Sequence, residues 1–451
     1  MLGFQSTKLK TTRFVHALQI CAITVGASTA IAVSSVAAAE NEFATHAELG
    51  LMQGFPPSEE KRVDRSNALF GVPYNRWSYQ NMRSLYPTAN IPTANQPVAI
   101  NRKIDGGIDS LKVKRENGEV VDMPTWLRES YTDSLVVIQG DAIVWERYLN
   151  GMNADSAHQM MSVTKSFAGL FGLMAVSDGL LSEDDPVTKY VPELKASGGF
   201  GQATFRHVLD MTASVGFSEE YADPNSGITQ YTKVLGFKAA PPEEIPANSI
   251  YEYLATLPTE EGHEDGDIFH YQTPKTDVVN WVTNRATGNS FQDYFYQTLW
   301  SKLGTDGETY VLLDRNGTLF AGGGLNATPN DLARFAVMML NDGKFNGQQV
   351  VDPAVIKQLS DGANIEAFSK GPASAGVMGN KDWSYRAQWW VRHTKDHESF
   401  SAIGVNGQWI YLDVKRNVAI IKQSSQPEAS ANKYDEFNVN AFDAIIGYLT
   451  R

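Results

Sequence analysis

The stretch Met161-Ser162-Val163-Thr164-Lys165-Ser166-Phe167 begins a run with helical periodicity, which we expect to extend from Ser162 to Val176. The pair Asp178-Gly179 follows this run and is typical of a helix end. The large apolar residues of the run recur at i, i+3, i+4 and i+7 as Phe167, Leu170, Phe171 and Met174. Because Ser162 and Lys165 are three positions apart, a helix would place the hydroxyl and the amine on one face.

This arrangement contains the elements of nucleophilic catalysis. A serine hydroxyl needs a neighbouring base, and a lysine serves as one when burial or nearby charge lowers its pKa. The backbone N–H groups at a helix start have no intrahelical acceptor and suit a developing oxyanion. The bare pattern S-x-x-K also occurs at Ser58/Lys61 and Ser430/Lys433, but both lie in polar surroundings. From the pattern alone, Ser162 is either a nucleophile or an ordinary helix N-cap.

Two further segments could complete a site. Tyr271, within residues 269–273, precedes a helix predicted to begin near Lys275. Its phenol could relay a proton, act as a base if ionised, or simply pack at a strand–helix junction. Residues 404–408 (GVNGQ) lead into an apolar strand. Their glycines would let a backbone edge approach a ligand and Asn406 could hold a substrate carbonyl or carboxylate, although an ordinary hairpin turn gives the same pattern.

The remaining pattern predicts an α+β fold. Apolar runs at 135–138 and 142–145 flank a Gly-Asp turn and predict a β-hairpin. Strands are expected again near the C-terminus at 387–392, 408–413 and 418–422, followed by a final helix at about 436–449. Between the two strand regions we expect helices at 204–211, 275–286, 290–303 and 329–341. An antiparallel sheet built from both chain ends, with a mainly helical insert at about 185–330, explains this order.

The N-terminus predicts an exported protein. Lys8, Lys10 and Arg13 precede an apolar, Ala-rich stretch from Val15 to about Val36, and residues 37–39 (AAA) offer a cleavage site. We therefore expect a signal peptide at 1–39 and a periplasmic or secreted bacterial enzyme without a stable membrane anchor after cleavage. A retained anchor is the alternative, since the stretch is long enough to span a bilayer. Residues 40–130 are irregular but rich in aromatics, and we expect an arm packed on a body at 131–451.

Composition excludes several functions. The chain has 451 residues, with 38 basic and 51 acidic residues, and its 42% hydrophobic content allows a sizeable core. Since no block of five basic residues occurs, nucleic acid is not an expected partner. The single cysteine lies inside the signal segment, so the mature protein would have no disulfide, cysteine nucleophile or thiolate metal site.

No cofactor or metal is expected from the other motifs. His393 and His397 are four apart, but their surroundings predict a strand entering a loop, where solvated histidines are usual. Neither H-E-x-x-H nor the G-x-S-x-G elbow of α/β-hydrolases occurs. Gly322-Gly323-Gly324 precedes a helix start but lacks a P-loop lysine, so a tight chain passage is the expected role.

At this point the residues show a resemblance. The order S-x-x-K, then a tyrosine about a hundred residues later, then a glycine-bracketed strand edge resembles the serine β-lactamase and penicillin-binding-protein superfamily. More narrowly, it is similar to the class C-like hydrolases of the 6-aminohexanoate-dimer hydrolase type, which are nylon-oligomer amidases. Supporting segments, which together span roughly residues 130–425, are 161–167 (MSVTKSF), 191–194 (VPEL), 208–212 (VLDMT), 220–221 (EY), 269–277 (FHYQTPKTD), 322–331 (GGGLNATPND) and 404–409 (GVNGQW).

The resemblance implies a β-lactamase-like fold and an acyl-serine mechanism. Ser162 would attack a carbonyl while Lys165 and Tyr271 move the proton to the leaving group. It also implies oxyanion donors at the nucleophile's own N–H and at a strand edge near residues 406–408, and a substrate-contacting Tyr221. The implied substrate site comprises Tyr221, Thr273, Asn406, Gly407 and Gln408.

Two departures bear on substrate. Thr273 stands where β-lactamases usually carry asparagine, and the third motif lacks the Lys-Thr-Gly that recognises a β-lactam carboxylate. Both favour an amidase or esterase acting on small or oligomeric substrates over a D-Ala peptidase or weak β-lactamase. A catalytically silent binding protein of the same fold is the third hypothesis. Substrate identity and oligomeric state remain open at this level.

Overall fold

The computed structural model describes residues 42–451 except 222, 373–375, 380–381 and 395–397. The predicted signal peptide at 1–39 lies outside the described residues. Residues 45–451 form one compact unit. No helix within the described ranges has both the length and the apolar character needed to cross a membrane.

Strands from both ends of the chain form the main sheet. In the described part of the chain this sheet has eight strands in the order β12-β13-β14-β15-β16-β5-β6-β2. The central pairing joins β16 to β5 in an antiparallel register, with Ile420 opposite Val137. The neighbouring pairs are antiparallel as well, except that β2 runs parallel to β6 at one edge. The prediction of an antiparallel sheet built from both chain ends is therefore confirmed.

The strands of this sheet are β12 (Trp383–Arg386), β13 (Trp389–His393), β14 (Glu398–Gly404), β15 (Gln408–Asp413), β16 (Val418–Ser424), β5 (Thr132–Gln139), β6 (Ala142–Tyr148) and β2 (Asn101–Arg102). A smaller sheet has the order β1 (Thr88–Ile91), β8 (Thr309–Leu312), β9 (Leu325–Ala327) and β7 (His158–Gln159). Two short hairpins complete the strands: β3 (Lys112–Lys114) with β4 (Val120–Asp122), and β10 (Lys344–Phe345) with β11 (Gln348–Gln349).

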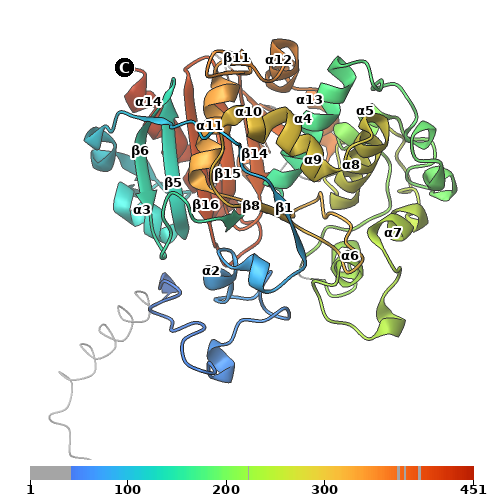
Figure 1. Cartoon of the computed structure of the whole chain (residues 1–451), viewed down its shortest axis with the longest axis horizontal. Helices are drawn as coiled ribbons and strands as arrows, with labels where there is room; N and C mark the ends of the chain where they lie inside the picture. The colour runs from blue at the N-terminus through green and yellow to red at the C-terminus, as the bar shows by residue number, and fades with distance from the viewer. Residues whose placement is uncertain (1–41, 222, 373–375, 380–381, 395–397) are drawn as a thin grey trace, which may run out of the picture. The chain divides into compact units, whose positions relative to one another are not determined.

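Helices cover both faces of the main sheet (Figure 1). Alternate strand residues point to opposite faces, so neighbours such as Val136 and Val137 belong to different hydrophobic clusters. On one face lie α4 (Val163–Ser177), α8 (Thr273–Thr287) and α11 (Pro329–Leu340). On the other face lie α3 (Met123–Glu129) and the C-terminal α14 (Asn432–Leu449).

The other α-helices are α2 (Asn75–Ser78), α5 (Phe205–Leu209), α6 (Gly227–Leu235), α7 (Ile250–Thr256), α9 (Phe291–Phe295), α10 (Ser301–Leu303), α12 (Pro353–Asp361) and α13 (Ile365–Lys370). Most expected helices are present within a few residues of their predicted bounds. The side chain of Thr328 caps α11 and Pro329 occupies its first turn, as the sequence predicts. Helix α14 begins at Asn432, several residues before the expected start.

Some expectations need correction. The strand predicted at 387–392 begins only at Trp389, because Ala387 and Gln388 adopt positive φ and form the turn after β12. Strands β12 and β14 were not expected. The segment at 40–130 is not uniformly irregular: its strand β1 pairs with β8 of the smaller sheet, and β2 extends the main sheet.

Candidate active site

Ser162 lies at the junction between strand β7 and helix α4. The preceding residue, Met161, has φ +48°, a left-handed conformation that a non-glycine side chain rarely adopts. Such strain often marks a functional turn. The Ser162 side chain makes no capping hydrogen bond to the helix, so its hydroxyl is not an ordinary N-cap. The structure thus argues against the N-cap role for this side chain.

Lys165 is buried one turn further along α4, with 1% of its surface exposed. Its Nζ donates to the Ser162 hydroxyl at 3.0 Å and to the Gly322 carbonyl at 2.5 Å. Burial lowers the pKa of Lys165 to about 8, although the charges of Glu219 and Asp277 oppose this shift. A lysine in this state can accept a proton near neutral pH, as a general base must.

Gly322 supplies the second anchor of Lys165 through a close chain approach. A Cβ at Gly322 would lie 2.3 Å from Cγ2 of Thr273, so only glycine fits against the start of α8. The amide of Gln159 binds the next carbonyl, that of Gly323, at 2.7 Å. The three-glycine run is therefore a tight passage beside the site, as expected.

Tyr271 contributes the third catalytic candidate. Its ring stacks on Trp390 at 5.4 Å, and the Lys165 ammonium lies 5.2 Å from the ring centroid. Burial raises the pKa of Tyr271 far above its usual value; a hydrogen bond with Ser162 acts in the opposite direction and the charge of Glu219 adds to the rise. The phenol is therefore protonated at neutral pH. Tyr271 is thus brought beside Ser162 and Lys165, which were predicted from a different motif.

Glu219 links two predicted substrate residues and was not predicted itself. Its carboxylate accepts hydrogen bonds from the Thr273 N–H at 3.0 Å, the Thr273 hydroxyl at 2.5 Å and the Tyr221 hydroxyl at 3.1 Å. The hydroxyl of Thr273 is thus committed to Glu219. The sequence singled out the neighbouring pair Glu220-Tyr221, and no local signal separates Glu219 from Glu220 in this irregular segment.

The predicted site at 406–408 has a different role from the one expected. Oδ1 of Asn406 accepts from the Tyr79 hydroxyl at 2.8 Å, and Nδ2 donates to the Gln426 carbonyl at 2.8 Å. The N–H of Asn406 donates to the Ala429 carbonyl, so it does not serve as the expected oxyanion donor. The amide of Gln408 likewise binds backbone groups, including the Ser424 carbonyl at 2.6 Å. These side chains shape the loop.

The part of this loop that reaches the nucleophile is Gly404. A Cβ at Gly404 would lie 3.0 Å from the backbone nitrogen of Ser162 and 2.5 Å from the carbonyl of Met160. The end of β14 therefore meets the start of α4, which makes Val405 the nearest following residue with an N–H. Gly407 has φ +88° and supports the turn that returns the chain into β15.

The side chains considered as metal ligands do not form a metal site in the described residues. Within the described residues, no three His, Cys, Asp or Glu side chains gather closely enough to hold a metal ion. His393 lies at the end of β13, where its Nε2 is 2.8 Å from the Ser384 hydroxyl. His397, its sequence partner in the pattern, lies outside the described residues.

The chain is similar in sequence and in fold to known proteins. A sequence model of the beta-lactamase family matches residues 128–442. The 6-aminohexanoate-dimer hydrolase of Paenarthrobacter ureafaciens is 32% identical over 358 residues, which cover 79% of this chain and 87% of that relative. A solved Bacillus anthracis structure, provisionally assigned as a 6-aminohexanoate-dimer hydrolase, has a TM-score of 0.78 at 27% identity, covering 88% of this chain and 99% of the other.

The fold extends to more distant proteins. Simvastatin synthase (LovD) from Aspergillus terreus has a TM-score of 0.55 at 14% identity, covering 72% of this chain and 96% of the other, which shows a common fold alone. The family model and the P. ureafaciens relative both cover most of the chain. The chain therefore belongs to the beta-lactamase family and is a hydrolase of the β-lactamase and penicillin-binding-protein superfamily, related to 6-aminohexanoate-dimer hydrolase.

Proposed function

We propose that this protein is an exported serine hydrolase that cleaves amide or ester bonds through an acyl intermediate on Ser162. The observation that carries the proposal is the hydrogen bond from buried Lys165 Nζ to the Ser162 hydroxyl at 3.0 Å. A lysine with a pKa of about 8 is neutral often enough near pH 7 to accept the serine proton. Export is proposed from the N-terminal sequence pattern alone.

The proton balance of the reaction follows from this arrangement. Neutral Lys165 takes the proton of Ser162 as Oγ bonds to the substrate carbonyl carbon, forming a tetrahedral oxyanion. Collapse of the tetrahedral intermediate breaks the bond to the leaving nitrogen or oxygen. Tyr271 donates its phenolic proton to that atom, and the Lys165 ammonium returns a proton to Tyr271. Water then attacks the acyl-serine by the reverse proton route and releases the acid. The raised pKa of Tyr271 supports a relay of protons over a phenolate base.

The oxyanion hole in this proposal consists of the N–H groups of Ser162 and Val405. The first is at the start of α4, where N–H groups lack intrahelical acceptors. The second follows Gly404, whose close approach to the Ser162 nitrogen brings this edge to the reacting carbonyl. Two fixed backbone donors stabilise the charge that develops in the transition state.

The proposed substrate class is a small or oligomeric amide or ester, with amide cleavage supported by the name of the P. ureafaciens relative. A cavity of about 290 Å³ beside Tyr221, lined also by Phe70 and Phe237, is where we place the substrate portion remote from the scissile bond. The strand edge around Gly404 lacks the Lys-Thr-Gly sequence, so nothing at this edge favours a β-lactam substrate.

Labelling with a fluorophosphonate probe tests the proposal. Wild-type protein should be labelled and Ser162→Ala should not. The matched controls are Ser58→Ala and Ser430→Ala, which remove the serine of the same pattern at two other places; Ser58 bonds the Glu60 carboxylate at 2.8 Å, and Lys433 pairs with Glu428 at 2.5 Å. Both controls should be labelled as wild type. Equal labelling of Ser162→Ala, or none of wild type, would refute the proposal.

A further inference from the structure

Tyr79, in the N-terminal arm directly after α2, contacts both chain segments that meet at the nucleophile. Its hydroxyl donates to Oδ1 of Asn406 at 2.8 Å, with the Leu69 carbonyl at 2.9 Å as an alternative acceptor. Its backbone carbonyl accepts a hydrogen bond from the N–H of Gln159 at 2.8 Å. Gln159 belongs to β7 and lies three residues before Ser162, whereas Asn406 lies two residues after Gly404.

These two segments carry the two N–H groups assigned above to the oxyanion hole. The relative position of these N–H groups depends on how the end of β14 sits against the segment from Gln159 to Ser162. Tyr79 makes hydrogen bonds to both segments, and its side chain is fully buried. Asn406, with φ +60°, lies in the turn between β14 and β15, and the Tyr79 hydroxyl gives this turn a contact from outside its own hairpin.

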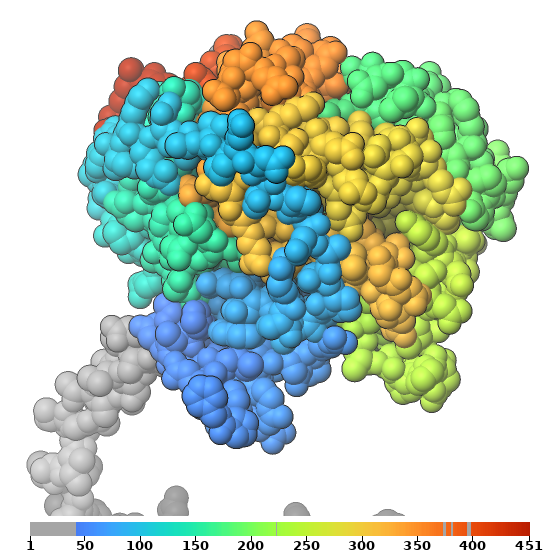
Figure 2. Space-filling view, in the orientation of Figure 1, coloured from blue at the N-terminus to red at the C-terminus, as the bar shows by residue number. Residues whose placement is uncertain are grey.

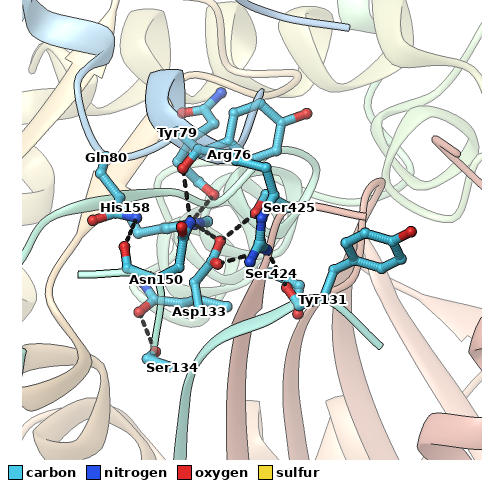
Figure 3. A network of polar contacts seen from close by, with 12 residues as sticks. Arg76, Tyr79, Gln80, Tyr131, Asp133, Ser134, Asn150, His158, Ser424 and Ser425 are labelled. Atoms are coloured by element: carbon cyan, nitrogen blue, oxygen red, sulfur yellow. Dashed lines mark hydrogen bonds and ion pairs between the residues drawn. The ribbon is translucent and has the colours of Figure 1, made fainter. Parts of the chain in front are cut away.

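A buried polar network binds Arg76, three residues before Tyr79, to the body of the protein (Figure 3). Nη1 of Arg76 lies 3.0 Å from the Asp133 carboxylate and donates to the Ser425 hydroxyl at 2.8 Å. The same carboxylate accepts from Ser425 at 2.6 Å and lies 3.1 Å from Nε2 of His158 in β7. Burial raises the pKa of Asp133, but the charge of Arg76 and the bond to His158 outweigh it and keep the pKa below its usual value.

The arm also holds the far side of the same loop. Nδ2 of Asn75 donates to the carbonyls of Ser425 at 3.1 Å and Gln426 at 2.9 Å. Gln426 in turn bonds Asn406, since its carbonyl accepts from Asn406 Nδ2 and its N–H donates to the Asn406 carbonyl at 3.2 Å. Three arm residues, Asn75, Arg76 and Tyr79, are therefore hydrogen-bonded to the strand edge, the nucleophile strand and the sheet.

We infer that Tyr79 is a positioning residue that aligns the N–H groups of Ser162 and Val405 with the developing oxyanion. The inference rests on the proposed function, because it concerns the same oxyanion hole. Tyr79 does not contact the substrate; it acts through Asn406 on one side and through Gln159 on the other. Through Tyr79, the arm therefore contributes to the geometry of the oxyanion hole.

The test compares Tyr79→Phe with Tyr86→Phe. Tyr86 is a matched control because it is also a buried arm tyrosine, whose hydroxyl donates to a backbone carbonyl, that of Arg65, at 3.1 Å. Kinetics with a p-nitrophenyl ester would give kcat and KM, and a boronic acid would serve as a transition-state analogue. Tyr79→Phe should lower kcat between about tenfold and about 100-fold, because a misplaced donor costs less than a removed one.

The pattern of the remaining parameters identifies the role. For Tyr79→Phe, KM should stay within about twofold while the boronic acid binds more weakly by about the factor lost in kcat/KM. Both variants should lose similar thermal stability, but Tyr86→Phe should keep its kcat. A kcat of Tyr79→Phe within about twofold of wild type, or an equal loss in Tyr86→Phe, would overturn the inference.

Two provisions keep the test decisive. If Tyr79→Phe does not fold, Asn406→Gly answers the same question, because glycine keeps the positive φ and removes the acceptor of the Tyr79 hydroxyl. It should show the same loss of kcat, and an unchanged kcat would overturn the inference. Failure of the proposed function is separate, since wild type would then not react with the fluorophosphonate at all.

Discussion

The low pKa of Lys165 predicts a specific pH dependence of acylation. With a pKa of about 8, about one molecule in ten has a neutral Lys165 at pH 7, against about one in 3,000 for an unperturbed lysine. If only the neutral amine accepts the serine proton, kcat/KM rises about tenfold per pH unit below 8 and levels off above it.

Replacing Glu219 with Gln tests the origin of this pKa. The Glu219 charge raises the pKa of Lys165, so its removal should disfavour the ammonium and lower that pKa. The ascending limb of the profile of kcat/KM against pH should therefore move to lower pH. For a shift of about one unit, the variant at pH 6 would retain about ninefold more of its own plateau activity than wild type does. Normalisation to the plateau is needed because Glu219 also holds Thr273.

The assay is the hydrolysis of a p-nitrophenyl ester, followed at the isosbestic wavelength from pH 5.5 to 9.5 with spontaneous hydrolysis subtracted. Glu220→Gln is the matched control, since it removes the same charge from the adjacent exposed residue. The ascending limb of its pH profile should coincide with that of wild type. A limb of Glu219→Gln that stays in place or moves to higher pH would refute the reasoning, as would an equal shift in Glu220→Gln.

Three further substitutions should each give a distinct result. Gly322→Ala places a Cβ 2.3 Å from Thr273, so it should displace the carbonyl that accepts from Lys165. We expect kcat to fall by at least about tenfold, with about 1–3 kcal/mol lost in urea unfolding. Arg76→Met leaves the buried Asp133 charge without its guanidinium and should cost about 3–5 kcal/mol in the same assay; a loss below about 1 kcal/mol would contradict the buried pairing. Tyr271→Phe should lower kcat by about 100-fold or more for amides, but less for p-nitrophenyl esters, whose leaving group needs no proton; equal losses would argue against a relay.

The parts of the site that sequence could predict are those with local spacing. Ser162 and Lys165 are one helical turn apart, and the apolar periodicity behind them predicts both the helix and the burial of the amine. Tyr271 precedes a helix with Pro274 in its first turn, which places it at the helix entrance. The strands at both chain ends were predictable for a similar reason, because apolar runs and turn residues define them locally.

The missed features depend on contacts between distant residues. The Gly322 carbonyl is 157 positions from Lys165, and Tyr79 is 327 positions from Asn406. No local pattern encodes either partner. The contacts of the glycine run and of the arm tyrosine could therefore not be predicted from the neighbouring residues. Strand β14 was missed because Ser399 and Ser401 are buried in it, whereas the alternation rule assigns such polar residues to the solvent side.

The pairing of β16 with β5 has a consequence for biosynthesis. The hairpin of β5 and β6 is synthesised well before the strand that covers the open side of β5, which comes from residues 418–424. Until then, a row of unsatisfied amide and carbonyl groups flanked by Val136, Val137 and Ile138 lies uncovered and invites pairing with another chain. A nascent chain interrupted before β16 therefore exposes this strand edge to chaperones and proteases.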